Sequence, residues 1–362
     1  MRFMVKPVEK NISRLITMLV TCVLLVAGCG KKTVDVPITA FADEAENGFI
    51  IYYIDVGQAD SALVVCDGKA MLIDGGNAAD SDLIYTFLRD HGVTHLDYIV
   101  ASHADEDHVG GLAGALNYAT AGTAYCPVTE HHTRAFNSFV KYLEAQGVSI
   151  TVPNHGDTFM LGSATVQIVG PIRHTRDQNN CSIVIRITYG ATSFLFTGDS
   201  ERPEEQEILD AGYDISATVL KVSHHGSETS TTYPFLREVM PEYAVISCGR
   251  NNSYGHPHDD TLSRLRDADV TVYRTDMQGT VTCVSDGRAV SFTVERNAGA
   301  VTNPTELTSP TDEDYYIGNI NSKKLHRPSC SGLPFERNRV IFDTYDEAIN
   351  AGYDPCGICL KP

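Results

Sequence analysis

The sequence predicts a mixed α+β fold with one large domain, followed by a small module held together by a metal ion. Strand-like and helix-like segments alternate from residue 49 to residue 296, with hairpins inserted between them. One histidine and three closely spaced cysteines lie in the last segment, 315–362. The chain has 362 residues, whereas single cores stop growing at about 250 to 300 residues, so a second, smaller unit is expected.

The N-terminal segment, residues 1–29, is expected to be an export signal. Basic residues between positions 2 and 14 precede the mostly apolar run 15–26. This run is shorter than the roughly 20 apolar residues that a comfortable membrane span needs. It ends in the sequence LVAGC at 25–29, which resembles the lipobox of bacterial lipoproteins and implies lipidation of Cys29.

The lipobox resemblance predicts a chain anchored by lipid to the extracellular face of the bacterial cell membrane. The polar segment 30–48 would be the tether between the lipid and the large domain. A plain secretory signal, which would release the chain, and an uncleaved anchor are the alternatives. Both also place the body of the chain outside the cytoplasm.

The large domain, residues 49–296, begins with strands. The runs 49–54, 61–66 and 70–73 are rich in β-formers, and Asp67-Gly68 is a hairpin signal between the last two. Apolar residues at helical spacing predict a helix over 80–91, and the strand 96–101 follows. The other predicted strands are 165–169, 182–188, 193–197, 218–222, 243–247, 271–273, 280–284 and 290–294, and the other predicted helices are 111–118, 135–146, 203–211, 233–239 and 261–268. The segment 297–314, rich in Thr, Pro and Asn, is predicted to be a linker.

The formal net charge of -18 argues against a protein coated in basic surface. Nonspecific affinity for nucleic acid depends mainly on Lys and Arg side chains that neutralise phosphates. A local basic groove or a metal ion would still allow phosphate binding, so the charge makes DNA binding less expected without excluding it.

The motif SHADEDHVGG at 102–111 is the strongest chemical signal in the sequence. His103, Asp105, Asp107 and His108 place four potential metal ligands within six residues, directly after a predicted strand and before a glycine-rich helix start. Imidazole and carboxylate together suit Zn²⁺, Mn²⁺ or Fe. The alternative is a polar turn in which an Asp caps the following helix.

Other acidic and imidazole side chains follow predicted strands elsewhere in the large domain. Asp199 ends the strand 193–197 through Thr-Gly-Asp, and His224 and His225 follow the strand 218–222. Asp74-Gly75-Gly76 and His256-Pro257-His258 add further candidates. Together these segments predict a metal-binding cleft assembled from loops at strand ends.

The order of six motifs over about residues 49–295 resembles the competence-protein (ComEC-type) branch of the metallo-β-lactamase superfamily. The motifs are DVGQADS (55–61), LIDGG (72–76), SHxDxDHxGG (102–111), TGD (197–199), SHHGS (223–227) and YGHPH (254–258). The resemblance implies a four-layer αβ/βα sandwich with the site at one edge.

The resemblance also implies a set of ligands for one or two divalent metal ions, Zn²⁺ or Mn²⁺. One ion would be held by His103, Asp105 and Asn180, the other by Asp107, His108 and one of His224 and His225, with Asp199 as the bridge. Of the histidine pair, we expect His225. Most of the superfamily has His where this chain has Asp105, and an Asn179–Ser182 segment replaces the isolated third-motif His. An oxygen-richer site shifts the preference from Zn²⁺ towards Mn²⁺.

The function that the resemblance favours is phosphodiester cleavage in DNA by a metal-activated hydroxide. Asp107 would orient the hydroxide, and His256 and His258 would contact the phosphate or protonate the leaving group. The same chemistry serves ester, thioester and lactam hydrolysis, which is one alternative, and a surface protein that binds DNA without cutting it is another. No obligate protein partner is expected.

The C-terminal segment 315–362 combines His326-x-x-x-Cys330 with Cys356-x-x-Cys359. Two close pairs of soft ligands predict a structural zinc site, and a tail this short needs such a staple. Disulfides and free thiols are the alternatives. The segment resembles the small Ada-type metal-binding module, and its basic residues suggest that it docks on DNA. The scattered Cys66, Cys126, Cys181, Cys248 and Cys283 are expected to be buried as small apolar residues.

Overall fold

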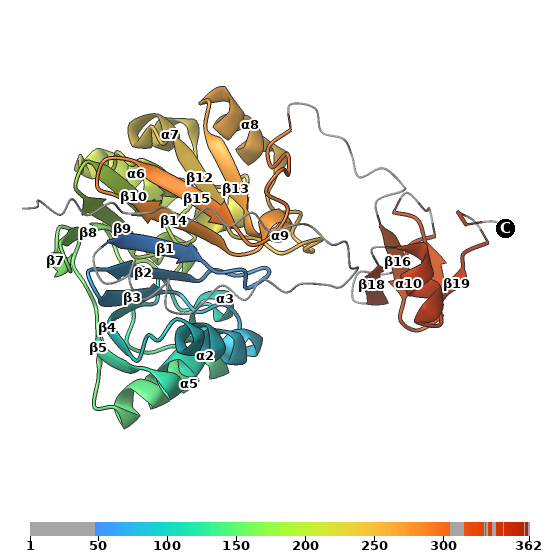
Figure 1. Cartoon of the computed structure of the whole chain (residues 1–362), viewed down its shortest axis with the longest axis horizontal. Coiled ribbons are helices and arrows are strands. Elements are labelled where there is room, and N and C mark those ends of the chain that lie inside the picture. The colour runs from blue at the N-terminus through green and yellow to red at the C-terminus, as the bar shows by residue number, and fades with distance from the viewer. Residues whose placement is uncertain are drawn as a thin grey trace, which may run out of the picture. The chain divides into compact units, whose positions relative to one another are not determined.

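The computed structural model describes residues 48–304 and, except for 329, 331, 335–337, 343 and 358, residues 315–360 (Figure 1). The predicted signal, its lipidation site Cys29, the tether up to residue 47 and the linker residues 305–314 lie outside the described residues. In the part of the chain that is described, no helix is both long enough and apolar enough to cross a membrane.

The large domain contains two mixed sheets. The first has the strand order β15-β14-β1-β2-β3-β4-β5-β6, and the second has the order β13-β12-β11-β10-β9-β8-β7. The strands of the first sheet are β1 (Phe49–Tyr53), β2 (Ala62–Cys66), β3 (Lys69–Ile73), β4 (His95–Val100), β5 (Thr120–Tyr125), β6 (Ile150–Thr151), β14 (Val281–Ser285) and β15 (Val290–Val294). Those of the second are β7 (Thr158–Leu161), β8 (Ala164–Gly170), β9 (Val184–Tyr189), β10 (Thr192–Phe196), β11 (Val219–Lys221), β12 (Tyr243–Ile246) and β13 (Thr271–Arg274).

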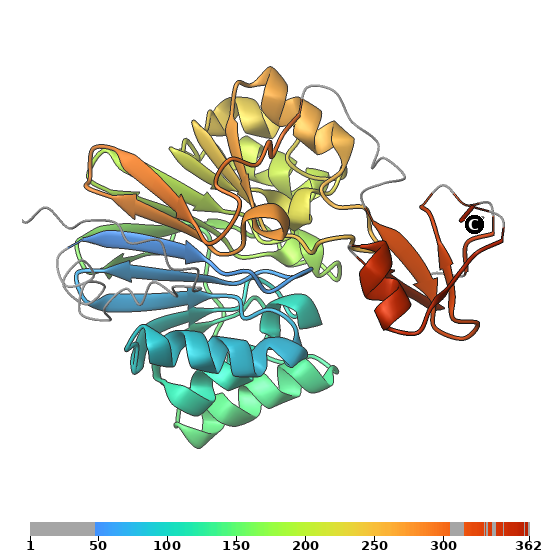
Figure 2. The same cartoon turned by 45° about the vertical axis from the view of Figure 1, so that its right-hand side comes forward.

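Helices cover the outer face of each sheet, which gives the four-layer αβ/βα sandwich (Figures 1 and 2). The helices on the side of the first sheet are α2 (Ser81–Asp90), α3 (Glu106–Val109), α4 (Leu112–Tyr118) and α5 (Arg134–Ala145). Those on the side of the second are α6 (Arg202–Ala211), α7 (Tyr233–Val239) and α8 (Asp259–Asp267), and the short α9 (Thr275–Gln278) follows β13. The predicted fold is therefore confirmed.

The alternation of side chains along β1 explains why two cores form. Phe49, Ile51 and Tyr53 pack in the core between the two sheets, whereas Ile50 and Tyr52 pack in the core under the helices of the first sheet. Successive side chains of a strand point to opposite faces, so a fully apolar strand such as β1 is buried on both sides. A third core lies between the second sheet and its helices.

Within the large domain, the predicted elements differ from the structure in several places. The strands β5, β6 and β7 were not predicted, because their sequences are short or half-exposed and lack a strong apolar pattern. The motif 102–111 contains the short helix α3, so the helix predicted over 111–118 is preceded by another turn of helix. The described part of the predicted linker is bonded to the large domain, since Thr302 donates to the Val272 carbonyl at 2.6 Å and Asn303 accepts from Arg266 at 2.7 Å.

The C-terminal module has a four-stranded sheet of order β18-β16-β17-β19 and one helix. Its elements are β16 (Tyr316–Asn319), β17 (Lys324–His326), β18 (Arg339–Phe342), α10 (Tyr345–Asn350) and β19 (Asp354–Pro355). The core is small and consists of Leu325, Phe342, Ala348 and Tyr353, with partly buried side chains around it. A core of this size does not stabilise a fold well by itself, which agrees with the expectation that a bound metal ion holds the module together.

Candidate metal centre

Loops that follow parallel strands bring the candidate ligands of the large domain together. Strand β3 pairs in parallel with β4, and β10, β11 and β12 pair in parallel with one another. The carboxyl ends of parallel strands lie at the same edge of their sheet. The segments after β4, β10 and β11 carry the motifs at 102–111, 197–199 and 223–227.

Four side chains form the centre of the site. The ligand atoms of Asp107, His108, Asp199 and His225 all lie within 4.8 Å of one another. His108 Nε2 is 3.3 Å from Asp199 Oδ1, and His225 Nε2 is 3.3 Å from Asp107 Oδ2 and 3.6 Å from Asp199 Oδ2. Two imidazoles and two carboxylates at such distances make a donor set suited to a divalent ion of the first transition row.

The orientation of the two imidazoles fits a metal ion. His108 Nδ1 is 2.9 Å from Asp74 Oδ2, and His225 Nδ1 donates to the Ser247 carbonyl at 3.0 Å. When Nδ1 carries the proton, the lone pair of Nε2 faces the cluster. Among the described residues, neither Nε2 atom nor Asp199 Oδ1 forms a well-aligned hydrogen bond, although all three are buried and face the other groups of the cluster at 3.3 Å or more. Buried polar atoms of this kind are usually satisfied, so a cation between them is the simplest explanation.

The carboxylates of the cluster also favour positive charge at its centre. Burial lowers the pKa of His108, but the carboxylates of Asp199 and Asp74 raise it more, and its pKa lies well above the usual value. Burial likewise opposes the charge of His225, yet Asp199 and Asp60 raise its pKa to about 10. The acidic surroundings therefore attract positive charge, which protons supply when no metal ion is bound.

The loop that carries His225 has an unusual backbone. His224, His225 and Gly226 all have positive φ, at 48°, 53° and 87°. Two consecutive non-glycine residues in the left-handed region cost energy and are found mainly where function requires them. A side chain on Gly226 would also place its Cβ 2.5 Å from the Cβ of Pro257. The motif SHHGS thus needs glycine at its fourth position.

Glycines in two other motifs allow their loops to touch backbone to backbone. Gly75 N donates to the His108 carbonyl at 2.7 Å, and Gly111 N donates to the Gly76 carbonyl at 3.1 Å. A Cβ on Gly75 would lie 2.6 Å from Leu112 N. The LIDGG and DHVGG segments are therefore locked together, which holds Asp74 beside His108.

Three further predicted ligands lie next to the cluster without completing a second group of four. His103 Nε2 is buried and 3.6 Å from Asp105 Oδ2, and its ring centroid is 4.1 Å from that of His108. The Asp105 side chain is 43% exposed. His224 Nε2 lies 3.6 Å from Asp199 Oδ2, and its Nδ1 lies 3.2 Å from Glu201 Oε1. The structure places His225, rather than His224, inside the cluster.

Asn180 is not brought to the cluster as a ligand. Its Nδ2 donates to Asp177 Oδ2 at 2.8 Å, and its Oδ1 accepts from the backbone N–H groups of Glu201 and Glu204 at 3.2 and 3.3 Å. Both ends of the amide are engaged at the start of α6. The structure therefore gives Asn180 the role of capping a helix in place of the predicted metal contact.

His256 and His258 differ in what their rings can offer. His258 Nδ1 accepts from Glu228 N at 3.0 Å, so its Nε2 carries the proton and donates to the Tyr254 carbonyl at 3.1 Å. Both nitrogens contact backbone groups, so His258 holds the segment around Tyr254 in place, and its predicted catalytic role stays a prediction. His256 Nδ1 accepts from Gln58 Nε2 at 3.3 Å, because Gln58 Oε1 is taken by Gly249 N. The Nε2–H of His256 is thereby fixed as a donor.

His256 stays neutral near the cluster. Burial, together with His225 and His224, lowers its pKa to about 4. Its ring centroid is 6.2 Å from that of His225 and 5.5 Å from that of His224. A neutral imidazole with a fixed N–H suits a contact with an oxygen of the substrate.

The sequence did not single out Asp60 and Lys221, which also support the ligands. Asp60 is buried, with its Oδ2 2.9 Å from Lys221 Nζ and its Oδ1 3.3 Å from His225 Nδ1. Lys221 is also buried and donates to the Val222 carbonyl at 2.9 Å. Asp60 belongs to the DVGQADS motif, which was the only sequence signal for it. A buried pair across 161 positions of the sequence cannot be recognised from local pattern.

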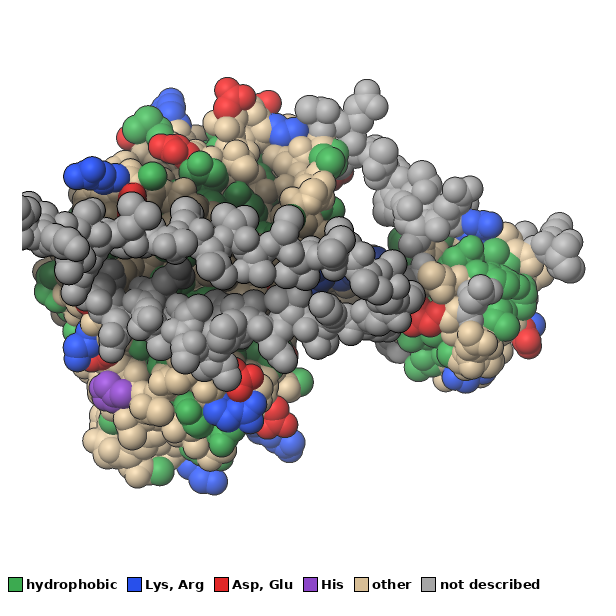
Figure 3. Space-filling view, in the orientation of Figure 1, with side chains coloured by type: hydrophobic (Ala, Val, Ile, Leu, Met, Phe, Trp, Pro, Cys, Tyr) green, Lys and Arg blue, Asp and Glu red, His purple; other side chains and the backbone are tan. Residues whose placement is uncertain are grey.

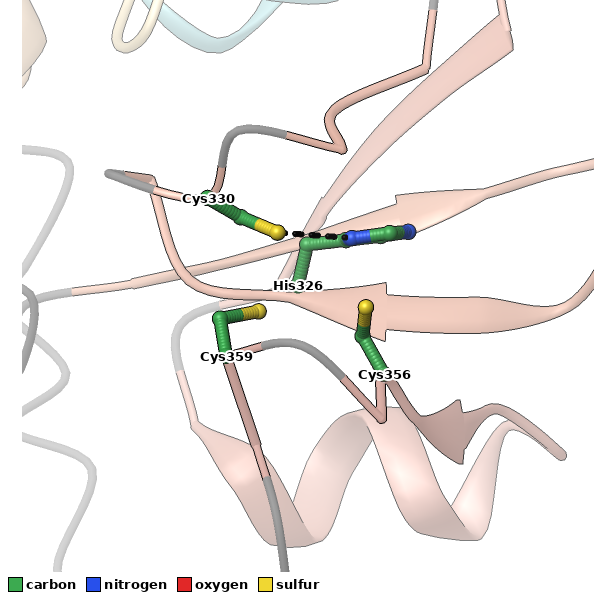
Figure 4. A group of neighbouring side chains, drawn as sticks. All are labelled: His326, Cys330, Cys356 and Cys359. Atoms are coloured by element: carbon green, nitrogen blue, oxygen red, sulfur yellow. Dashed lines mark hydrogen bonds between the residues drawn. The ribbon is translucent and has the colours of Figure 1, made fainter.

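The C-terminal module brings its four predicted ligands together (Figure 4). His326 Nδ1 is 3.4 Å from Cys330 Sγ, and the ligand atoms of these residues and of Cys356 and Cys359 lie within 4.8 Å of one another. Backbone N–H groups of Arg327 and Gly332 point at Cys359 Sγ and Cys330 Sγ at 3.3 and 3.4 Å. Such bonds support thiolates that bind a metal.

All eight described cysteines are free thiols. Disulfides were the alternative for the C-terminal cysteines, and the described part of the module contains none. The five scattered cysteines of the large domain are buried, as expected. Burial raises the pKa of Cys126 and Cys283 to about 12, which keeps these thiols protonated and unreactive.

Curated relatives include two proteins of bacterial competence. ComE operon protein 3 of Bacillus subtilis (strain 168) is 30% identical over 260 residues, which cover 67% of this chain and 34% of that protein. Competence protein ComA of Neisseria gonorrhoeae is 32% identical over 236 residues, covering 65% and 32%. The chain thus spans about a third of the length of these relatives.

The chain is also similar to solved structures and to two protein families. The metallo-beta-lactamase fold protein YhfI from Bacillus subtilis is 14% identical, with a TM-score of 0.43, covering 68% of this chain and all of that one. Residues 307–361 match the metal binding domain of Ada. Residues 54–250, more than half of the chain, match the metallo-beta-lactamase superfamily, and the chain therefore belongs to this superfamily of metal-dependent hydrolases.

Proposed function

We propose that this chain is a metal-dependent phosphodiesterase that cleaves DNA outside the cytoplasm, anchored to the outer face of the membrane by a lipid on Cys29. The observation that supports hydrolysis is the group of Asp107, His108, Asp199 and His225, in which His108 Nε2, His225 Nε2 and Asp199 Oδ1 are buried and have no hydrogen-bond partner among the described residues. DNA as the substrate rests on the resemblance to the competence branch.

Asp107, Asp199 and His256 would have different roles in the reaction. A divalent ion, when bound, would activate water and neutralise charge on a phosphate. Asp107 is partly exposed and faces His225, so its carboxylate can accept a proton from the attacking water and orient it. Asp199 touches His108, His224 and His225, which suits a carboxylate shared between two ions. His256 would donate its Nε2–H to an oxygen of the phosphate or the leaving group.

We propose Mn²⁺ or Zn²⁺ as the metal, bound as one or two ions. Asp107, His108, Asp199 and His225 form the more complete site. The neighbouring His103, Asp105 and His224 would serve a second ion that is held less tightly, because Asp105 is exposed and Asn180 is engaged elsewhere. Mn²⁺ is favoured because this chain has Asp105 where most of the superfamily has His, and a carboxylate oxygen suits Mn²⁺ better than an imidazole does.

In the C-terminal module we propose one structural Zn²⁺ on His326, Cys330, Cys356 and Cys359, and docking on DNA. Deletion of residues 315–362 should weaken DNA binding at low salt. On the part of the large domain that Figure 3 leaves uncovered, acidic and basic side chains are interspersed. Unchanged DNA affinity after the deletion would contradict docking by the module.

The proposed function is tested by incubating the purified chain with labelled single- and double-stranded DNA and Mn²⁺, Zn²⁺ or Mg²⁺. Cleavage should require metal, stop on chelation, and be lost in Asp107→Ala. Cleavage that survives in Asp107→Ala would contradict the assigned site. Hydrolysis of an ester, thioester or lactam without cleavage of DNA would replace the proposed substrate.

A further inference from the structure

We infer that Tyr254 is a stacking platform for an unpaired nucleobase and gives the site a preference for single-stranded nucleic acid. This inference rests on the proposed function and names its substrate class more closely. It starts from the position of Tyr254 at the outer end of a row of aromatic rings that leads away from the metal centre.

The row consists of His225, His256 and Tyr254. The ring of His256 stacks against that of His225, with centroids 6.2 Å apart and planes 24° apart. The ring of Tyr254 stacks against that of His256, with centroids 5.6 Å apart and planes 23° apart. Tyr254 is 67% exposed, which is unusual for a large aromatic side chain next to a buried site. A further flat ring placed on Tyr254 would continue the row.

The loop that carries Tyr254 is held in one shape before any ligand binds. Asn252 Oδ1 accepts from Tyr254 N at 3.1 Å and from His256 N at 3.0 Å, while Asn252 Nδ2 donates to the Gly249 and His256 carbonyls. His258 donates to the Tyr254 carbonyl from the other side. A side chain presented by a fixed loop binds without a large ordering cost.

The same loop forms one wall of a groove of about 750 Å³ that runs past His256. Arg250, Arg274 and Arg296 line this groove, but Arg274 forms a two-pronged pair with Asp276, and Arg296 lies 2.7 Å from Asp55. Because much of the positive charge is neutralised, the groove is not a strongly basic track. Stacking, rather than charge, would then supply the local affinity for the strand.

A base can stack flat on Tyr254 only if it is free of its own stack. Bases of an intact duplex are paired and stacked on their neighbours, so they would have to be pulled out first. An aromatic side chain accepts any base, because every base has a flat face. The expected preference is therefore for unpaired bases of any sequence.

The test compares cleavage of single-stranded oligonucleotides with and without abasic sites by the whole chain in Mn²⁺. For the strand with bases, Tyr254→Ala should raise KM by roughly 5- to 150-fold and leave kcat nearly unchanged. Tyr254→Phe should keep the wild-type KM. For the abasic strand, all three proteins should have the same high KM. Tyr233→Ala is the matched control, because Tyr233 is 55% exposed but lies on α7 and not in the segment 252–258 that carries Tyr254.

The outcomes separate the inference from the proposed function. If the wild-type chain cleaves abasic and normal strands with the same KM, or if Tyr254→Ala has no more effect than Tyr233→Ala, the stacking platform is refuted and the nuclease stands. If neither strand is cleaved with any metal ion, the proposed function itself fails.

Discussion

Replacing Asp74 with Asn should remove the carboxylate that orients the ring of His108, while the side chain keeps nearly the same size and shape. The buried Asp74 carboxylate accepts from Ser102 N at 2.7 Å, from Ser102 Oγ at 2.8 Å, and lies 2.9 Å from His108 Nδ1. Asparagine keeps one acceptor oxygen, but its NH₂ group would face one of these donors. If it faces Nδ1–H, His108 must move its proton to Nε2, which is the atom that would bind the metal.

The expected size of this effect follows from the same contacts. Loss of a partner that orients a ligating histidine lowers metal affinity by about 10- to 100-fold, or about 1.4 to 2.7 kcal/mol. The metal-free protein should lose about 1 to 3 kcal/mol of stability, because one buried donor is left without an acceptor. Competition with a fluorescent chelator gives the affinity, and thermal unfolding in EDTA gives the stability.

Asp97→Asn is the matched control for Asp74→Asn. Asp97 lies on β4 and also accepts from a backbone N–H, that of Ala70, at 3.0 Å, but it has no part in the metal centre. Its replacement should leave metal affinity unchanged. Equal metal affinity of the wild type and Asp74→Asn would refute the idea that Asp74 fixes the His108 ring.

Three other changes have expected outcomes. Metal binding should release protons, since the pKa of His108 lies well above its usual value and that of His225 is about 10 without metal. Metal affinity should therefore fall as the pH falls. Calorimetry in buffers of different ionisation enthalpy measures the proton release, and identical heats in those buffers would contradict it. Cys356→Ser should lose one equivalent of zinc per chain by elemental analysis while the unfolding of the large domain stays unchanged, and an unaltered zinc content would contradict the proposed staple. Lys221→Met should destabilise the protein by about 3 to 5 kcal/mol because it leaves the buried Asp60 carboxylate without its ammonium partner. A chemical denaturation midpoint equal to that of the wild type would contradict a stabilising role of the Asp60–Lys221 pair.

The sequence indicates which side chains the fold gathers at the centre of the site, because these side chains follow strongly apolar strands. Asp199 and His225 come directly after β10 and β11, and the fold brings such strand ends to one edge. The strand β1 is apolar at every position, and this local pattern agrees with its burial on both faces.

Other features depend on contacts that no local pattern contains. Asn180 was expected to bind metal, but the start of α6 engages its amide, and α6 approaches only in the folded chain. His258 belongs to a motif rich in imidazole, yet both its nitrogens bond to backbone groups. The Asp60–Lys221 pair joins the two sheets of the sandwich, and it forms only after both sheets have packed.

The central claim is that a divalent ion binds between His108, Asp199 and His225. Crystals of the chain soaked in Mn²⁺ should show an anomalous diffraction peak between these side chains, at about 2.0 to 2.3 Å from His108 Nε2 and His225 Nε2. A protein that binds Mn²⁺ in solution and whose crystals show the peak elsewhere, with these three side chains bonded only to one another, would contradict the account.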